Sequence, residues 1–213
     1  MEAFYDALDL LSGMIRIPSF SREENDVADY LFSQWTKAGH KVNRAGNNLW
    51  IVAPGFELGK QTILLNSHID TVKPVAGWSK DPFAADAGED DRLYGLGSND
   101  AGASVVSLYE AFTILSKKSQ PSNLIFLASC EEEVSGKNGL ELALAELPPI
   151  HFAVVGEPTE MQPAVAEKGL MVLDCIALGK AGHAARNEGV NAILLAMKDI
   201  EWFTTYQFPE KSD

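Results

Sequence analysis

The sequence predicts an α/β fold in which a mostly parallel sheet is flanked by helices, followed by the start of a smaller α+β domain. Three nearly continuous apolar stretches carry this prediction, namely residues 61–67 (QTILLNS), 122–129 (SNLIFLAS) and 151–156 (HFAVVG). Strands that are apolar on both faces and alternate with helices are typical of parallel sheets covered on both sides.

Two helices are expected before the first strands. Apolar residues recur at helical spacing from Phe4 to Ile15, and Pro18 ends that segment. Ser21 followed by Glu24 has the form of a capping box. This pair predicts a second helix from Arg22 to Ala38, which stops at Gly39.

The remaining elements follow from the same periodicities and from a loop rich in Asp, Gly and Pro. Strands are expected at 41–44, 48–53 and 61–67, the loop at 73–98, helices at 101–116 and 136–147, and strands at 122–129 and 151–156. A strand-like stretch at 170–179 and a helical stretch at 191–203 would open a second unit. We therefore expect a first domain over residues 1–168 and the start of a second over 169–213.

Composition excludes several classes of partner. The chain has 213 residues, of which 30 are acidic and 17 basic, so its formal net charge is −13. A nucleic-acid surface needs a basic stripe, and docking on anionic lipid needs basic clusters, so we expect neither nucleic acid nor membrane as a partner. The first twenty residues carry acidic side chains where a signal peptide would carry basic ones. Cys130 and Cys175 are far apart in apolar surroundings, so we expect both to be reduced residues of the core. We expect a cytoplasmic protein.

Polar side chains gather where the predicted strands end. His68 and Asp70 follow the first of the three apolar strands, residues 131–133 (EEE) follow the second, and Glu157 follows the third. Asp100 stands at the start of the helix after the long loop. Parallel strands bring their carboxyl ends to one crevice, where open α/β sheets bind ligands. Carboxylates gathered beside one imidazole favour a cation, and oxygen and nitrogen ligands suit zinc, cobalt or manganese.

Other chemistries fit the sequence poorly. The stretch 95–102 (GLGSNDAG) resembles a nucleotide-binding loop, but Asp100 stands where that loop needs glycine. The sequence has no GxSxG elbow of a serine hydrolase. Cys130 with His183 would make a thiol nucleophile, but the adjacent carboxylates would keep the thiol protonated. His40 and His151 start strands away from the acidic cluster and are expected to be structural or surface residues.

Six motifs occur in an order that resembles the two-zinc deacylase and carboxypeptidase family. They are SHIDTV, GWSKDPF, YGLGSNDAGA, CEEEVSG, VGEPT and GKAGHAAR, and they span essentially the whole chain. That family includes acetylornithine deacetylase, succinyl-diaminopimelate desuccinylase, aminoacylase and glutamate carboxypeptidase. Within it the sequence is most similar to acetylornithine deacetylase and its succinylornithine relatives.

The resemblance implies a set of metal ligands. His68 and Glu157 would bind one metal ion, Glu133 would bind a second, and Asp100 would bridge both. Asp70 would hold the ring nitrogen of His68 that does not face the metal, a contact that fixes the tautomer. The ions would be zinc, with cobalt or manganese as alternatives.

The resemblance also implies catalytic roles. Glu132 corresponds to the general base of metal-assisted amide hydrolysis, whereas Glu131 corresponds to a position that neither binds metal nor acts as base. His183 would lie on a lid and dimerisation domain and bind the substrate carbonyl of the partner in a homodimer. The first domain, residues 1–168, would then be a metal-binding catalytic domain, and 169–213 would start the lid.

The function implied is hydrolysis of the amide bond of a small N-acyl amino acid, N-acetylornithine or N-succinylornithine, in arginine biosynthesis. A metallo-dipeptidase or carboxypeptidase is one alternative, and a non-catalytic metal-binding module is another; Glu132 favours an enzyme, because a pure binder needs no base. Related enzymes are longer, and their second histidine ligand and substrate-carboxylate contacts follow the point where this chain stops. We therefore expect a fragment that is inactive alone.

Overall fold

The chain forms two compact units, Met1–Pro163 and Ala164–Asp213. The computed structural model describes residues 2–88, 92–166, 169, 171–186 and 188–209. The boundary between the units lies slightly before the one expected after residue 168. The assignment of the second unit to a lid and dimerisation domain stays a prediction.

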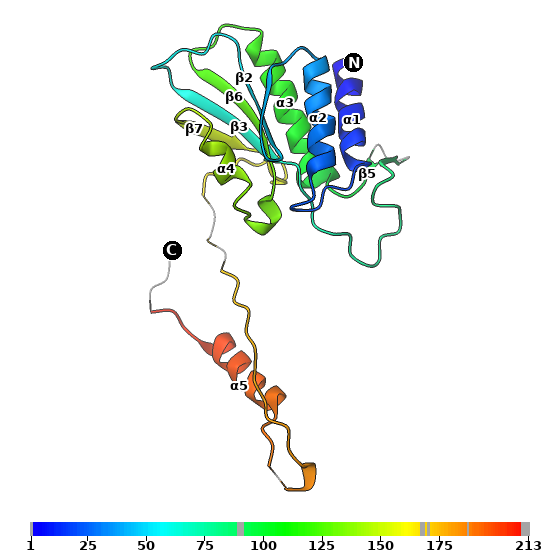
Figure 1. Cartoon of the computed structure of the whole chain (residues 1–213), viewed down its shortest axis with the longest axis vertical. Coiled ribbons are helices and arrows are strands. Elements are labelled where there is room, and N and C mark those ends of the chain that lie inside the picture. The colour runs from blue at the N-terminus through cyan, green and yellow to red at the C-terminus, as the bar shows by residue number, and fades with distance from the viewer. Residues whose placement is uncertain (1, 89–91, 167–168, 170, 187, 210–213) are drawn as a thin grey trace. The chain divides into compact units, whose positions relative to one another are not determined.

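A five-stranded sheet forms the centre of the first unit (Figure 1). Its strands lie in the order β1-β2-β6-β3-β7, with bounds β1 Val42–Ala45, β2 Asn48–Val52, β3 Thr62–His68, β6 Asn123–Ser129 and β7 Phe152–Val155. The predicted α/β class is confirmed, and β3 runs parallel to both β6 and β7. The sheet is nevertheless mixed, because β1 and β2 pair antiparallel and β2 pairs antiparallel with β6. Only two residues join β1 to β2, and so short a connection joins antiparallel strands only.

Three helices cover one face of the sheet, as Figure 1 shows: α1 (Glu2–Ile15), α2 (Asn25–Lys37) and α3 (Ala103–Ser116). Fully buried aromatic side chains form the centre of this core. The ring of Phe126 in β6 lies 5.3 Å from the ring of Trp35 in α2 and 6.1 Å from that of Phe112 in α3. Burying such a side chain contributes roughly 1.5–3 kcal/mol to folding.

The other face of the sheet carries a smaller core. Ile125 and Leu127 of β6 point to this face, because successive strand residues point to opposite sides. They pack with Trp50 and Leu64 against Ala143 of α4 (Leu140–Leu144). The helix predicted over 136–147 is therefore present but shorter, since Gly139 precedes its first residue.

The predicted capping box at the start of α2 is wrong. Arg22 has a φ of 75°, so the backbone there is left-handed and the helix begins only at Asn25. Glu24 occupies the N-cap position without a side-chain capping hydrogen bond. The Ser21 hydroxyl donates instead to the carboxylate of Asp70, 2.8 Å away.

Several short local elements were not predicted. Within the loop 73–98, β4 (Asp86–Ala87) and β5 (Leu93–Tyr94) pair as a small antiparallel sheet. A π-helical turn, η1 (Ser98–Gly102), precedes α3 and contains a kink at Asp100. This turn carries one of the predicted metal ligands.

The second unit contains α5 (Ala192–Thr205), which matches the helix predicted over 191–203. The helix begins after Asn191, whose side chain accepts the Ile193 N–H over 2.9 Å. The strand predicted over 170–179 is wrong for the described residues 171–179, and residue 170 lies outside the described residues. The nearest β pairing is a single isolated bridge between Lys180 and Val190. Within the described part of the chain, residues 171–179 therefore have no neighbouring strand with which to form a hydrogen-bonded ladder.

No helix in the described part of the chain is long and apolar enough to cross a membrane.

Candidate metal centre

His68 is the last residue of β3, and its ring is almost completely buried, with 1% of the side chain exposed. Nδ1 lies 3.0 Å from the backbone carbonyl oxygen of Asp70. Because a carbonyl oxygen can only accept, this contact assigns the hydrogen of a neutral ring to Nδ1. In that neutral ring Nε2 carries the lone pair, whereas the protonated ring, favoured at neutral pH by a pKa raised to about 9, carries a hydrogen on both nitrogens.

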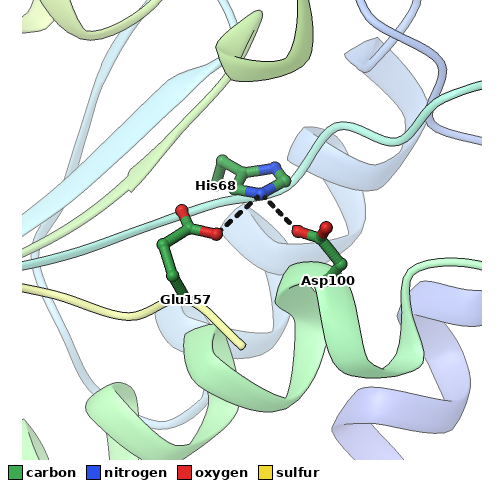
Figure 2. Close-up of side chains that lie close together, drawn as sticks. All are labelled: His68, Asp100 and Glu157. Carbon is green, nitrogen blue, oxygen red and sulfur yellow. Dashed lines mark hydrogen bonds and ion pairs between the residues drawn. The ribbon is translucent and has the colours of Figure 1, made fainter. Parts of the chain in front are cut away.

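Two carboxylates converge on Nε2 of His68 (Figure 2). Asp100 Oδ1 lies 3.0 Å away and Glu157 Oε2 lies 3.7 Å away. One ligand atom from each of the three residues lies within 4.8 Å of the others. These are the residues that the family resemblance assigns to the first metal ion, and their ligand role stays a prediction.

The parallel pairing of β3 with β7 explains why the cluster forms. Gly156 follows β7, where its N–H donates to the Asn66 carbonyl and its own carbonyl accepts the Ser67 hydroxyl, both over 2.8 Å. A Cβ at position 156 would lie 2.8 Å from Cβ of Ser104, so only glycine allows the start of α3 to come this close. As a result, Glu157 lies beside the carboxyl end of β3, where His68 is located.

The charges of the cluster are poorly balanced without a cation. Burial alone would lower the pKa of His68, but the hydrogen bond and charge of Asp70, with the charges of Glu157 and Glu132, raise it to about 9. Burial raises the pKa of Glu157, and its carboxylate neighbours add to this effect while His68 opposes it. Burial and then Asp100 raise the pKa of Glu133. A cation would relieve this repulsion.

Asp70 is fully buried two residues beyond β3 and connects that strand end to the segment 131–133. Its Oδ1 accepts the Glu132 N–H over 3.0 Å, and Oδ2 accepts the Glu133 N–H over 3.2 Å. Burial would raise the pKa of Asp70, but the hydrogen bonds from His68, Ser21 and Glu132 lower it.

The predicted contact from Asp70 to the ring of His68 takes a different form. The carboxylate oxygen lies 3.4 Å from Nδ1, farther than the carbonyl oxygen of the same residue. The backbone carbonyl and the carboxylate of Asp70 therefore both face Nδ1 of His68, and the carboxylate also binds Ser21 and the backbone of residues 132 and 133.

The three consecutive glutamates differ in their surroundings: Glu132 and Glu133 lie beside the cluster, and Glu131 contacts the following loop. Glu132 begins the 3-10 turn η2 (Glu132–Val134), and its half-exposed carboxylate lies 3.9 Å from Nε2 of His68. Glu133 is half-buried beside the cluster but is outside the group within 4.8 Å. Glu131 has a left-handed backbone and a buried side chain that accepts from Asn138 Nδ2 over 2.9 Å. Its neighbours, by contrast, face the cluster.

The other histidines singled out by the sequence have local partners of their own. His183 belongs to the second unit, where its Nδ1 accepts the Ala185 N–H over 3.2 Å, and its substrate role stays a prediction. His151 Nδ1 accepts the backbone N–H of Thr62. His40 packs its ring against Tyr109.

The two cysteines differ, and both are free thiols. Cys130 is buried as expected, and burial followed by the charges of Glu24 and Glu131 raises its pKa to about 12. A thiol with this pKa stays protonated at neutral pH, so Cys130 is poorly suited to act as a nucleophile. Cys175 is exposed, so the expectation that it is a core residue is wrong.

Ser21 and Glu24 belong to the surroundings of the candidate site, which the sequence did not reveal. Ser21 donates to Asp70, and Glu24 accepts the N–H of Glu131 over 3.2 Å. Their spacing was the only available signal, and it pointed to a helix cap.

Comparison with known families identifies the chain. Residues 64–208 match the model of peptidase family M20/M25/M40. The chain belongs to this family. The acetylornithine deacetylase of Proteus mirabilis is 34% identical over 149 residues, covering 69% of this chain and 38% of the relative. The acetylornithine deacetylase of Klebsiella pneumoniae is 31% identical over 193 residues, covering 88% of this chain and 45% of the relative. The chain thus spans less than half the length of either relative.

Solved structures of the family share the fold. An M20 family metallo-carboxypeptidase from Sulfolobus solfataricus aligns with a TM-score of 0.56 at 23% identity, covering 73% of this chain and 37% of the other. A tripeptidase from Staphylococcus aureus aligns with a TM-score of 0.59 at 20% identity, covering 92% of this chain and 55% of the other. These likenesses support the mixed α/β architecture described above.

Proposed function

We propose that this chain carries the metal-binding and proton-transfer part of a metal-dependent hydrolase of N-acyl amino acids. The observation that carries the proposal is the convergence of Asp100 and Glu157 on Nε2 of His68 at the carboxyl ends of neighbouring strands. One imidazole nitrogen and two carboxylates, with no thiolate among them, fit zinc, and also cobalt or manganese.

The donor set divides between two ions in the proposal. His68, Asp100 and Glu157 would hold the first ion, and Asp100 and Glu133 would contribute to the second. When bound, such ions act as Lewis acids toward an amide carbonyl and increase the acidity of water. The raised pKa values of Glu133 and Glu157 support the need for a cation here.

Glu132 is the proposed general base. Its carboxylate is half exposed, so it can meet both water and substrate, and it lies 3.9 Å from Nε2 of His68. It would take a proton from the attacking water and return it to the leaving amine, a role worth roughly 100- to 10,000-fold in rate. Asp70 accepts a hydrogen bond from the backbone N–H of Glu132 and so fixes the position of the backbone that carries this carboxylate.

The proposed substrate is N-acetylornithine or N-succinylornithine, within arginine biosynthesis. Two relatives above 30% identity carry the name acetylornithine deacetylase, which supports this choice. We further infer a cytoplasmic homodimer in which His183 binds the substrate carbonyl of the partner. The second candidate is hydrolysis of a small peptide, which the name of the matching peptidase family supports.

A fusion protein tests the proposal. The chain would be extended by the part of the Proteus mirabilis relative that follows the matched region, loaded with zinc, and given N-acetylornithine or a dipeptide. We expect zinc-dependent release of ornithine, and no turnover above background by the 213-residue chain alone. Faster cleavage of the dipeptide would favour the second candidate. A fusion that binds zinc but hydrolyses neither substrate would indicate a non-catalytic metal-binding module.

A further inference from the structure

Glu24 is a buried carboxylate that the proposed chemistry does not use. Its side chain is completely buried, yet it does not cap α2. Its hydrogen-bond donors are the backbone N–H groups of Arg22 and Glu131 and the side-chain amide of Asn47, at 2.6, 3.2 and 3.1 Å. Burying a carboxylate among neutral donors is unfavourable unless each hydrogen bond is well made. Its presence here therefore needs an explanation beyond helix stability.

The contact with Glu131 joins two segments that are 107 residues apart. Glu131 lies two residues beyond the end of β6 and has a left-handed backbone, with φ 54° and ψ 25°. At this residue the chain leaves the sheet and turns into η2. An acceptor placed on the Glu131 N–H therefore acts where the direction of the following residues is decided.

Glu24 and Asp70 bind consecutive backbone amides of the same turn. Glu24 accepts from the N–H of Glu131, and Asp70 accepts from the N–H groups of Glu132 and Glu133. The two carboxylates come from different parts of the chain, one from the start of α2 and one from the end of β3. The turn is thereby held from two sides. Charge-assisted hydrogen bonds of this kind are about twice as strong as neutral ones.

The rest of the loop is held independently of Glu24. The buried carboxylate of Glu131 accepts from the backbone and side chain of Asn138, and the Asn138 carbonyl accepts from Asn48 Nδ2 over 2.7 Å. The backbone N–H of Cys130 donates to the side-chain oxygen Oδ1 of Asn48. Loss of Glu24 should therefore loosen the turn at residues 131–133 without releasing the loop that follows.

We propose that Glu24 is a positioning residue of the candidate site, which sets the directions of Glu132 and Glu133 through the backbone of Glu131. The inference rests on the proposed function, in which Glu132 is the general base and Glu133 is a ligand of the second metal ion. Glu24 contacts neither substrate nor metal in this role.

Hydrogen exchange on the 213-residue chain gives the primary test. In Glu24→Ala, the amides of residues 131–133 should exchange at least ~10-fold faster than in the wild type, while amides at the centre of β6 keep their protection. Glu24→Gln should retain most of the protection, because its amide oxygen still accepts from the Glu131 N–H. Val27→Ala, a cavity variant in the same helix, controls for general loss of stability.

Cobalt titration, followed by visible absorption, tests the link to the site. The affinity of the ion at His68, Asp100 and Glu157 should change less than ~3-fold in Glu24→Ala, because none of these ligands lies on the clamped turn. The weaker ion that uses Glu133 should bind about 10-fold less tightly, the usual effect of removing an outer hydrogen bond.

Several results would overturn the inference. They are unchanged exchange at residues 131–133 in Glu24→Ala, equal loss in Glu24→Gln and Glu24→Ala, the same local pattern in Val27→Ala, or unchanged affinity for the weaker ion. A wild-type chain that binds no cobalt would contradict the proposed function instead. The exchange comparison would still decide whether Glu24 holds the turn.

Discussion

The carboxylate of Asp70 binds the backbone of Glu132, 62 residues further along the chain, over 3.0 Å. The same residue provides the carbonyl that accepts from the ring of His68. The end of β3 therefore fixes the candidate metal ligand and the candidate base together. A change at this one position should disturb both.

Replacement of Asp70 by asparagine should weaken both stability and metal binding. The carboxylate accepts from Ser21, Glu132 and Glu133, and an asparagine amide group would place a donor against at least one of these donors. Each buried group left unsatisfied costs about 1–3 kcal/mol. We also expect zinc affinity to fall roughly 10- to 100-fold. Urea unfolding and calorimetric zinc titration would measure the two effects.

Ser21→Ala is the matched control for that variant. It removes one donor to Asp70 and leaves the contacts to the backbone in place, so we expect a loss of about 0.5–1.5 kcal/mol and little change in zinc affinity. Equal effects of the two substitutions would show that the backbone contacts of Asp70 are unimportant.

The 213-residue chain should bind one transition-metal ion tightly. His68, Asp100 and Glu157 supply three ligands, the number that catalytic zinc commonly takes from a protein, whereas Glu133 shares Asp100 and adds no imidazole. Calorimetric titration should show at most one tight zinc site, which is lost in His68→Ala. At a free zinc concentration 100 times the dissociation constant, the ion should stabilise the fold by about 2.7 kcal/mol.

His151→Ala is the control for that titration, because His151 accepts from the Thr62 backbone and lies outside the cluster. Two equally tight zinc ions per chain would contradict this prediction. So would a tight site that survives in His68→Ala.

Glu132 and Asp100 should separate proton transfer from metal binding. In the zinc-loaded fusion, Glu132→Ala should keep its metal content while ornithine release falls roughly 100- to 10,000-fold. Asp100→Ala should lose metal as well as activity, because Asp100 lies 3.0 Å from Nε2 of His68. Metal analysis beside the activity assay gives both readings. If Glu132→Ala released zinc and Asp100→Ala did not, the two roles would have to be exchanged.

The two cysteines should differ in reactivity toward a thiol reagent. Burial and the charges of Glu24 and Glu131 raise the pKa of Cys130 to about 12, so at pH 8 its thiol is protonated as well as inaccessible. Cys175 is exposed. We expect one thiol to react in the native chain and two after denaturation, with peptide mapping to identify Cys175 as the fast one. Rapid native labelling of Cys130 would contradict its environment.

The same pKa makes a stability prediction whose sign is fixed. The folded-state pKa of the Cys130 thiol lies above its unfolded value of 9.0. Its contribution to stability is therefore fully present below pH 9 and is lost as pH rises toward 12. Cys130→Ala should remove this part of the alkaline loss in urea unfolding at pH 8 and pH 10. An identical pH dependence in the variant would contradict the assignment.

Strands β3 and β6 could be predicted from sequence because burial on both faces leaves continuous apolar runs. Residues 122–129 show this most clearly, since every residue of β6 is buried. Strand β7 was predicted from the same kind of run, but all four of its residues are exposed. Antiparallel pairing of β1 and β2 could have been inferred from their short connection. The stretch 170–179 is equally apolar but forms no strand in its described part, because a strand also needs a partner.

The convergence of His68, Asp100 and Glu157 was predictable from sequence, but the residues that support them were not. His68 and Glu157 follow predicted strands whose ends meet, and Asp100 precedes a predicted helix, so their convergence could be expected. Asp70 and Glu24 hold residues 131–133 through backbone amides, which every residue carries and which no sequence pattern marks. Ser21 and Glu24 have the spacing of a capping box, and only the left-handed backbone of Arg22 rules that reading out.

The central place of β3 between β6 and β7 has a consequence for biosynthesis. Both neighbours of β3 are translated after it, and the contact between Ser67 and Gly156 joins positions 89 residues apart. At about 5–20 residues per second, roughly 4–18 s separate synthesis of His68 from that of Glu157. During this interval the chain on the ribosome contains His68 but not yet Glu157, which lies two residues beyond β7. If His68, Asp100 and Glu157 bind a metal ion as proposed, the complete set of three ligands exists only after β7 has been made.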